Sequence, residues 1–154
     1  MYLGTKVATP NEFGADDTGT SLSTSAFLLA RDKAQSQNIP FAYHPGTYRI
    51  DQAIEFTSLV PIYGPGRRFP IMCEGTGGFR FLPTDVDWRY HDIRDVALIG
   101  NGATGHGIEV VLSAGAHYGY ASYTNVVARD FALEGLCWDN SVHNPDGFFE
   151  NTVR

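Results

Sequence analysis

Short apolar runs separated by glycine and proline fill the chain after residue 38. The runs are rich in β-branched and aromatic side chains and are bounded by turn-forming residues, which is typical of short strands. We predict strands over 41–43, 47–50, 59–63, 78–82, 96–99, 108–112, 123–127 and 131–133. Strands this short, joined by turns of varied length, favour the coils of a solenoid over a sandwich.

The segment 21–37 has a different spacing. Ser21 and Ser23 are good N-cap residues, apolar residues follow at helical intervals, and Asn38 and Pro40 stop the pattern. We predict a helix here that covers the apolar end of the first coil, because an open solenoid end invites aggregation.

The sequence also repeats itself. The segment 94–100 reads RDVALIG and returns 35 positions later as RDFALEG, and 107–110 is answered by 147–150 at a displacement of 40. A period in this range is typical of a solenoid, in which each coil packs against its neighbours. If the period is structural, the two Arg-Asp pairs stack as a ladder of opposite charges, which we expect to be a structural pairing rather than a site for an anionic sugar.

Composition and charge narrow the class of protein. Seventeen glycines, eight prolines, 13% aromatic and only 18% charged residues indicate a mostly β chain, and 154 residues suffice for one domain. A net charge of −6 argues against binding nucleic acid, whose phosphates need a basic face.

Cysteine usage and hydropathy exclude further classes. Cys73 and Cys137 stand among apolar or aromatic neighbours, outside any CxxC or Cys/His motif, so we expect buried free thiols, no metal and no cofactor. No segment is apolar enough for a signal peptide or a membrane span. We therefore expect synthesis in a host cytoplasm and no membrane partner.

Two segments on either side of the predicted helix resemble a known family. Residues 13–15 read FGA, Gly19 and Thr24 follow, and 44–50 read HPGTYRI. This order resembles the N-terminal signature of the pectate-lyase-like superfamily of single-stranded right-handed parallel β-helices. The family usually places two Asp just before the Thr of its capping helix, and here those positions are Leu22 and Ser23, with Asp16 and Asp17 upstream.

The resemblance implies a mostly β right-handed parallel β-helix with an N-terminal capping α-helix. The resemblance divides the chain into a lead-in segment at 1–20, the capping helix at 21–38 and the β-helix coils at 39–154. We expect the last coil either to continue in a longer natural protein or to be covered by another subunit. Many members with this signature and no secretion signal are bacteriophage tailspikes. The resemblance thus implies a homotrimer in the virion tail, with other tail proteins and host surface polysaccharide as partners.

Polysaccharide cleavage needs either paired carboxylates or a base beside a charge-neutralising cation. In an extended strand Asp85 and Asp87 would share a face, which makes them the candidate catalytic pair, although residues 83–85 also read as a turn. His106 and His117, in small-residue turns, are alternative general bases, with a solvent-facing loop role as the default. Glu134, Asp139 and Asp146 are further acidic residues near the C-terminus that could gather above the last coil.

Aromatic side chains suggest a binding surface. Trp88, Tyr90 and Trp138 are the candidate residues for stacking on a sugar ring. We therefore predict a tailspike or tail-fibre segment that serves adhesion or virion assembly. The alternative is a polysaccharide depolymerase, either a lyase or a glycoside hydrolase, acting on capsule or lipopolysaccharide. A secreted pectinase-like enzyme is disfavoured because no signal peptide is seen.

Overall fold

The computed structural model describes residues 6–83, 87–113, 116–139, 148–149 and 152–153. This part of the chain is mostly β with parallel sheets and one α-helix, as the composition predicts. A 3₁₀ turn η1 (Pro10–Phe13) precedes β1, and the helix α1 spans Thr24–Gln37. The strands are β1 (Thr18–Leu22), β2 (Phe41–Ala42), β3 (Thr47–Ile50), β4 (Ala53–Phe56), β5 (Ile62–Tyr63), β6 (Ile71–Cys73), β7 (Gly78–Phe81), β8 (Asp87–Arg89), β9 (Asp92–Arg94), β10 (Ala97–Gly100), β11 (Ile108–Val111), β12 (His117–Gly119), β13 (Ser122–Thr124), β14 (Val127–Arg129), β15 (Leu136–Asp139), β16 (Phe148–Phe149) and β17 (Thr152–Val153).

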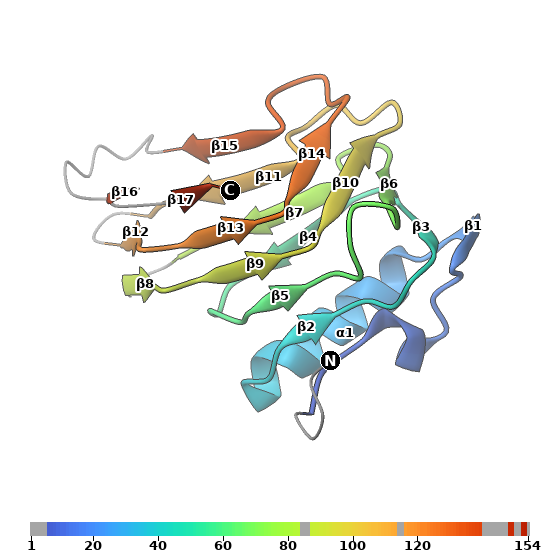
Figure 1. Ribbon diagram of the computed structural model, residues 1–154, viewed down its shortest axis with the longest axis horizontal. Helices are drawn as coiled ribbons and strands as arrows, with labels where there is room; N and C mark the ends of the chain where they lie inside the picture. Colours follow the sequence, from blue (N-terminus) through green and yellow to red (C-terminus); the bar gives the residue numbers. More distant parts are fainter. Residues whose placement is uncertain (1–5, 84–86, 114–115, 140–147, 150–151, 154) are drawn as a thin grey trace.

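The strands form four parallel sheets within the described ranges. Their orders are β1-β3-β6-β10-β14, β4-β7-β11-β15, β8-β12-β16 and β2-β5-β9-β13-β17. Consecutive strands therefore belong to different sheets, and the chain returns to each sheet one strand further along. Figure 1 shows this advance from β2 through β5 and β9 to β13, with α1 lying beside β2 at one end. None of the described helices is long and apolar enough to span a membrane.

Paired residues of neighbouring strands are between 21 positions apart, at Phe41 and Ile62, and 31 positions apart, at Ile62 and Ile93, so the predicted period of 35 is wrong. Arg94 pairs in register with Thr124, whereas Arg129 pairs with Ile99 in another sheet. The predicted Arg-Asp ladder is therefore absent. Likewise β11 pairs with β15 rather than with the segment at 147–150. In both RDxALxG segments the Arg ends a strand and the Asp follows it with positive φ, but the two strands, β9 and β14, belong to different sheets.

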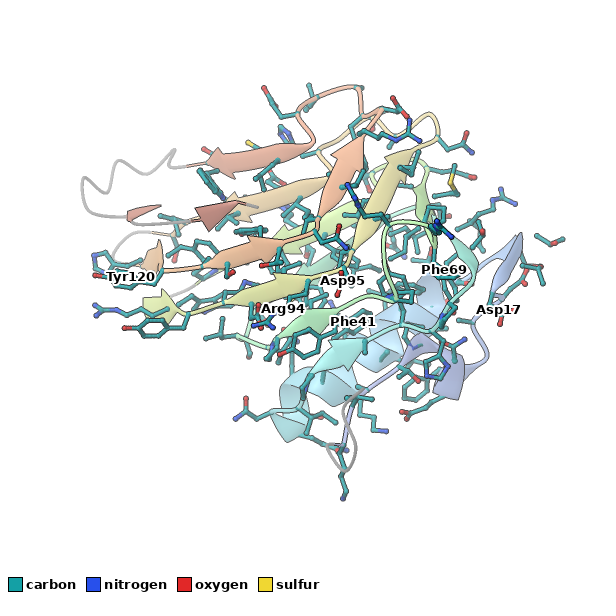
Figure 2. The ribbon with its side chains drawn as sticks, viewed as in Figure 1. Asp17, Phe41, Phe69, Arg94, Asp95 and Tyr120 are labelled. Carbon is teal, nitrogen blue, oxygen red and sulfur yellow. The ribbon has the colours of Figure 1, made fainter. Side chains whose placement is uncertain are left out.

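Equivalent turn residues identify the correct repeat. Asp95 and Asn125, 30 positions apart, connect the β9 sheet to the β10 sheet in successive passes, and the Asn125 side chain donates a hydrogen bond to the Asp95 carboxylate at 2.5 Å. Both have positive φ, 58° and 55°, a conformation that Asn and Asp tolerate better than most residues. Gly64 stands one pass earlier, where an added Cβ would lie 2.2 Å from the Asp95 carbonyl oxygen. Figure 2 labels Arg94 and Asp95 at this turn.

The inward side chains form one continuous aromatic and aliphatic core. Alternate residues are buried in strands such as β3, β4, β6 and β11. Their rings meet edge to face, as Phe41 does with Phe56 at 5.6 Å and Phe56 with Phe79 at 5.8 Å. Helix α1 adds Phe27 and contacts β4 and β2, the first strands of their sheets. The predicted burial of Cys73 is confirmed, while Cys137 is half-buried, and both are free thiols.

A chain of hydrogen bonds crosses this core. His91, which is 2% exposed, faces the Val60 carbonyl oxygen with Nε2 at 2.9 Å and the Tyr118 hydroxyl with Nδ1 at 2.8 Å. The Tyr118 hydroxyl lies 2.5 Å from that of Tyr123. Burial lowers the pKa of His91 to about 4 and raises the pKa of Tyr123 to about 12, so both side chains are neutral at pH 7.

The two segments that flank the helix are held together by specific contacts. The Thr47 amide donates to the Asp17 carbonyl oxygen at 2.7 Å, and Gly46, at a φ of 158°, leaves room for Asp17, which an added Cβ would meet at 2.6 Å. The buried Tyr48 hydroxyl accepts a hydrogen bond from the Asn11 amide at 3.0 Å. The PGTY segment thus forms β3 against the β1 segment, and the helix is held between them.

Local details depart from the sequence predictions. The helix begins at Thr24, with Ser23 as N-cap, while Ser21 lies in β1 and donates its amide to the Asp16 carboxylate at 2.6 Å. The Thr18 hydroxyl and amide also donate hydrogen bonds to the Asp16 carboxylate. Together with the Ser21 bond they lower the pKa of Asp16 to about 2. Residues 131–133 form no strand, and 123–127 divides between β13 and β14. Strands β1, β4, β6, β8, β9, β12, β15 and β17 were not predicted.

Candidate functional site

A groove of about 370 Å³ lies over the outer face of the β4-β7-β11-β15 sheet. Its floor comes from β4 and β7, and its rim comes from the turns before β7, β11 and β15. The lining residues are Ala53, Glu55, Thr76, Gly78, Phe79, Arg80, Gly105, His106, Glu109 and Leu133. Charged side chains and one imidazole therefore face the same small volume.

Strand register aligns the charged residues of the groove. Glu55 pairs with Arg80 across β4 and β7, and Arg80 pairs with Glu109 across β7 and β11. Arg80 Nη1 lies 3.0 Å from Glu55 Oε1, and Arg80 Nε lies 2.9 Å from Glu109 Oε2. The guanidinium thus bridges two carboxylates, an arrangement that avoids like charges on adjacent strands. Glu55, Arg80 and Glu109 thus form a ladder of opposite charges in a different sheet from Arg94 and Arg129.

Two turns bring His106 to the carboxylate of Glu134. The Gly107 amide donates to the Glu134 carbonyl oxygen at 3.1 Å, and the next amide donates to Gly135 at 2.8 Å. Glycine is needed at both positions: an added Cβ at Gly107 would lie 2.6 Å from the Gly135 oxygen, and one at Gly135 would lie 2.2 Å from the Ala128 oxygen. As a result His106 Nδ1 lies 2.9 Å from Glu134 Oε2, and Nε2 lies 3.9 Å from Glu109 Oε1.

The groove was not predicted from the sequence, because its charged residues are single positions in separate strands and form no contiguous sequence motif. A sequence signal does exist, since Glu55, Arg80 and Glu109 each stand between two apolar residues. Such an apolar-charged-apolar triplet places the charge outside and its neighbours inside. His106 and Glu134 were both named as candidates from the sequence, but nothing in the sequence brought them together.

Of the candidate catalytic pair, only the backbone of Asp87 falls within the described residues. Asp85 lies outside the described residues, as does Asp146. The backbone of Asp87 is in β8, paired with His117 of β12, in a sheet separate from that of the groove. Asp139 is the last residue of β15.

The three candidate sugar-binding aromatics lie in different environments. Trp88 is 1% exposed and packs against Phe81 and His91, so its ring is not available to a glycan. Trp138 is 40% exposed, and its side chain hydrogen-bonds to Tyr123. Tyr90 is 73% exposed.

Tyr90 stacks on a tyrosine of the next pass of the chain. The rings of Tyr90 and Tyr120 are 5.4 Å apart and 15° from parallel, and both residues have positive φ in the turns that follow β8 and β12. Figure 2 shows Tyr120 at the opposite side of the molecule from Asp17. The two rings form a small exposed aromatic surface, which we call the tyrosine pair.

Comparisons with known proteins support the fold. Neither a family model nor a curated protein sequence matches the chain. Among solved structures it is similar to Geobacillus virus E2 ORF18, with a TM-score of 0.56 and 18% identity over 86% of this chain and 28% of that one. It is also similar to the Agl-KA catalytic domain, with a TM-score of 0.56 and 15% identity over 96% of this chain and 37% of that one. The chain therefore shares a parallel β fold with a phage protein and with a catalytic domain, and it spans about a third of either.

Proposed function

We propose that this chain is a β-helix segment of a phage tailspike or tail fibre that binds host surface polysaccharide. The four sheets are the faces of the helix, and α1 is the cap on its first coil. The regular return of the chain to each sheet and the similarity to a phage protein support this architecture. In this proposal the assembled protein is a homotrimer in the virion tail, joined to other tail proteins.

The observation that carries the adhesion role is the tyrosine pair. Sugars bind exposed rings through their apolar faces. Tyr120 stacks on one face of the Tyr90 ring and holds it in place, and the 73% exposure of Tyr90 leaves its other face open to a sugar residue. The Tyr90 and Tyr120 hydroxyls add hydrogen-bonding groups at the edges of the pair.

Calorimetric titration with a panel of bacterial capsular and lipopolysaccharide glycans tests the proposal. For a glycan that binds, we expect Tyr90→Ala to weaken affinity about 2- to 12-fold, which corresponds to about 0.5–1.5 kcal/mol of ring stacking. Phe13→Ala is the matched control, because Phe13 is also an exposed ring, at 37%. Equal affinities for the Tyr90 variant and the parent would refute the role of the pair.

The groove favours a second candidate, a polysaccharide depolymerase. Arg80 supplies a cation and His106 a candidate base for β-elimination beside a uronate, while Glu55 and Glu109 are carboxylates two strands apart, roughly 9.5 Å along the sheet. Incubation with the same glycans, followed by assays for unsaturated sugars and new reducing ends, tests this. If the double variant Arg80→Met/His106→Ala still releases these products, the groove is not the site of cleavage.

A further inference from the structure

Three metal-ligating side chains from two successive passes of the chain meet at the rim of the groove. His106 precedes β11, while Glu134 precedes β15 and Cys137 lies within it, and one ligand atom from each lies within 4.8 Å of the other two. Cys137 pairs in register with Glu109, so its side chain shares the outer face of the sheet with the charged ladder. The adhesion role uses none of these residues.

We propose that His106, Glu134 and Cys137 bind one divalent transition-metal ion of the Zn²⁺ class. An imidazole nitrogen, a thiolate and a carboxylate are the donors that Zn²⁺ takes in proteins, whereas Ca²⁺ and Mg²⁺ prefer oxygen alone. Three protein ligands leave a fourth tetrahedral position for water or another small ligand on the side of the groove.

The geometry at His106 supports a shared ion. Nδ1 is buried and has no hydrogen-bond partner among the described residues, yet it lies 2.9 Å from Glu134 Oε2. Two oxygen or nitrogen ligands of a tetrahedral zinc ion lie about 3.3 Å apart, and a sulfur lies about 3.6 Å from either. Binding therefore needs the His106 and Glu134 atoms to separate by about 0.4 Å and the Cys137 sulfur, which lies within 4.8 Å of both, to approach by no more than about 1.2 Å.

An outer shell of charged residues is already in place. A metal-bound histidine commonly donates its second ring N–H to a carboxylate, and His106 Nε2 faces Glu109 at 3.9 Å. Arg80 holds that carboxylate from the other side, at 2.9 Å. A small shift of the imidazole toward Glu109 on metal binding would complete this hydrogen bond and make Glu109 a positioning residue for the ring.

The charge around Cys137 also favours a cation. Cys137 pairs in register with Glu109 and lies in the same cluster as Glu134, so its sulfur stands among carboxylates. A divalent ion would neutralise this negative surrounding and hold the sulfur as thiolate. The sequence alone pointed to no metal because 31 positions separate His106 from Cys137, and only the return of the chain joins them.

Cobalt titration followed by absorption tests the site directly. We expect one Co²⁺ per chain, a thiolate-to-cobalt charge-transfer band in the near ultraviolet, and displacement of the ion by Zn²⁺. Cys137→Ala should abolish the band. His106→Ala and Glu134→Gln should weaken binding by more than the roughly 10- to 100-fold that loss of an outer-shell partner causes, and Glu109→Gln should fall within that range.

The matched control is His44→Ala, because His44 is an exposed loop histidine remote from the cluster. It should bind cobalt as the parent does. No band at millimolar Co²⁺, or a band that persists in His106→Ala, would overturn the proposal.

Alkylation of the unmodified protein gives an answer even if a variant fails to fold. Zn²⁺ should slow the reaction of Cys137 with iodoacetamide at least 10-fold, while the buried Cys73 stays unreactive in both conditions and reports that the protein is folded. Equal rates with and without Zn²⁺ would refute the site. Because these measurements need no glycan, their outcome is independent of the adhesion role.

Discussion

The inner passes of the chain and the last described pass are packed differently. Phe41, Phe56 and Ile108 are fully buried, at 0% exposure. Leu136, which pairs with Ile108 on the next strand, is only half-buried, and Trp138 is 40% exposed. The same strand pattern thus produces a dense core where strands lie on both sides and a partly open surface where they do not. In this architecture burial depends on position in the stack more than on residue type.

Substitution in the helix-proximal core should have the largest effect on stability. Phe56 contacts Phe41, Phe79 and Phe81, so Phe56→Ala should lower the free energy of unfolding by about 3–5 kcal/mol. Leu29→Ala is the control, since Leu29 is 50% exposed on α1 and should change stability by no more than about 0.5 kcal/mol. Denaturant unfolding of both variants measures the contrast, and similar losses would contradict it.

Acid should destabilise the core through His91. The pKa of this buried imidazole is lowered from 6.5 to about 4, so the unfolded chain binds a proton there more readily than the folded chain does. The contribution of neutral His91 to the free energy of unfolding is fully present above pH 6.5. As the pH falls to 4 it is lost, which lowers the free energy of unfolding by about 3 kcal/mol. Denaturant unfolding at several pH values should show this slope, and it should persist in His44→Ala.

Leu136→Ala and Ile108→Ala compare the two passes at paired positions. Ile108→Ala should cost about 2–4 kcal/mol because it leaves a cavity between two strands. Leu136→Ala should cost about half of that or less, since its side chain is already partly in water. Equal costs in denaturant unfolding would mean that the last pass is covered as well as the inner one.

The smallest effect is expected outside the core. Arg80→Met removes both ion pairs of the groove, yet its partners Glu55 and Glu109 are partly exposed, so stability should fall by no more than about 1 kcal/mol. Thermal unfolding at low and high salt checks this, because screening should narrow the difference between variant and parent. A loss comparable to that of Phe56→Ala would place the ladder among the main sources of stability.

Local sequence determined the elements whose signals are local. The helix follows from the spacing of Ala26, Phe27, Ala30 and Ala34, and the strand Thr47–Ile50 follows from alternation bounded by Gly46. In each case residues close in sequence carry the information, since caps, turns and side-chain alternation act over a few positions. The mostly β class could be predicted for the same reason.

Only the tertiary structure decided which segments are neighbours. The RDxALxG echo suggested a period of 35, but inter-strand pairing aligned Asp95 with Asn125 and left Arg94 and Arg129 in separate sheets. The groove and the His106–Glu134–Cys137 cluster depend on that register, because side chains from distant positions meet only after each pass has been placed on the one before it. The alternation of apolar and polar residues determines which face of a strand a side chain occupies. The lengths of the turns determine which residue it lies beside on the next strand, and these lengths vary from pass to pass.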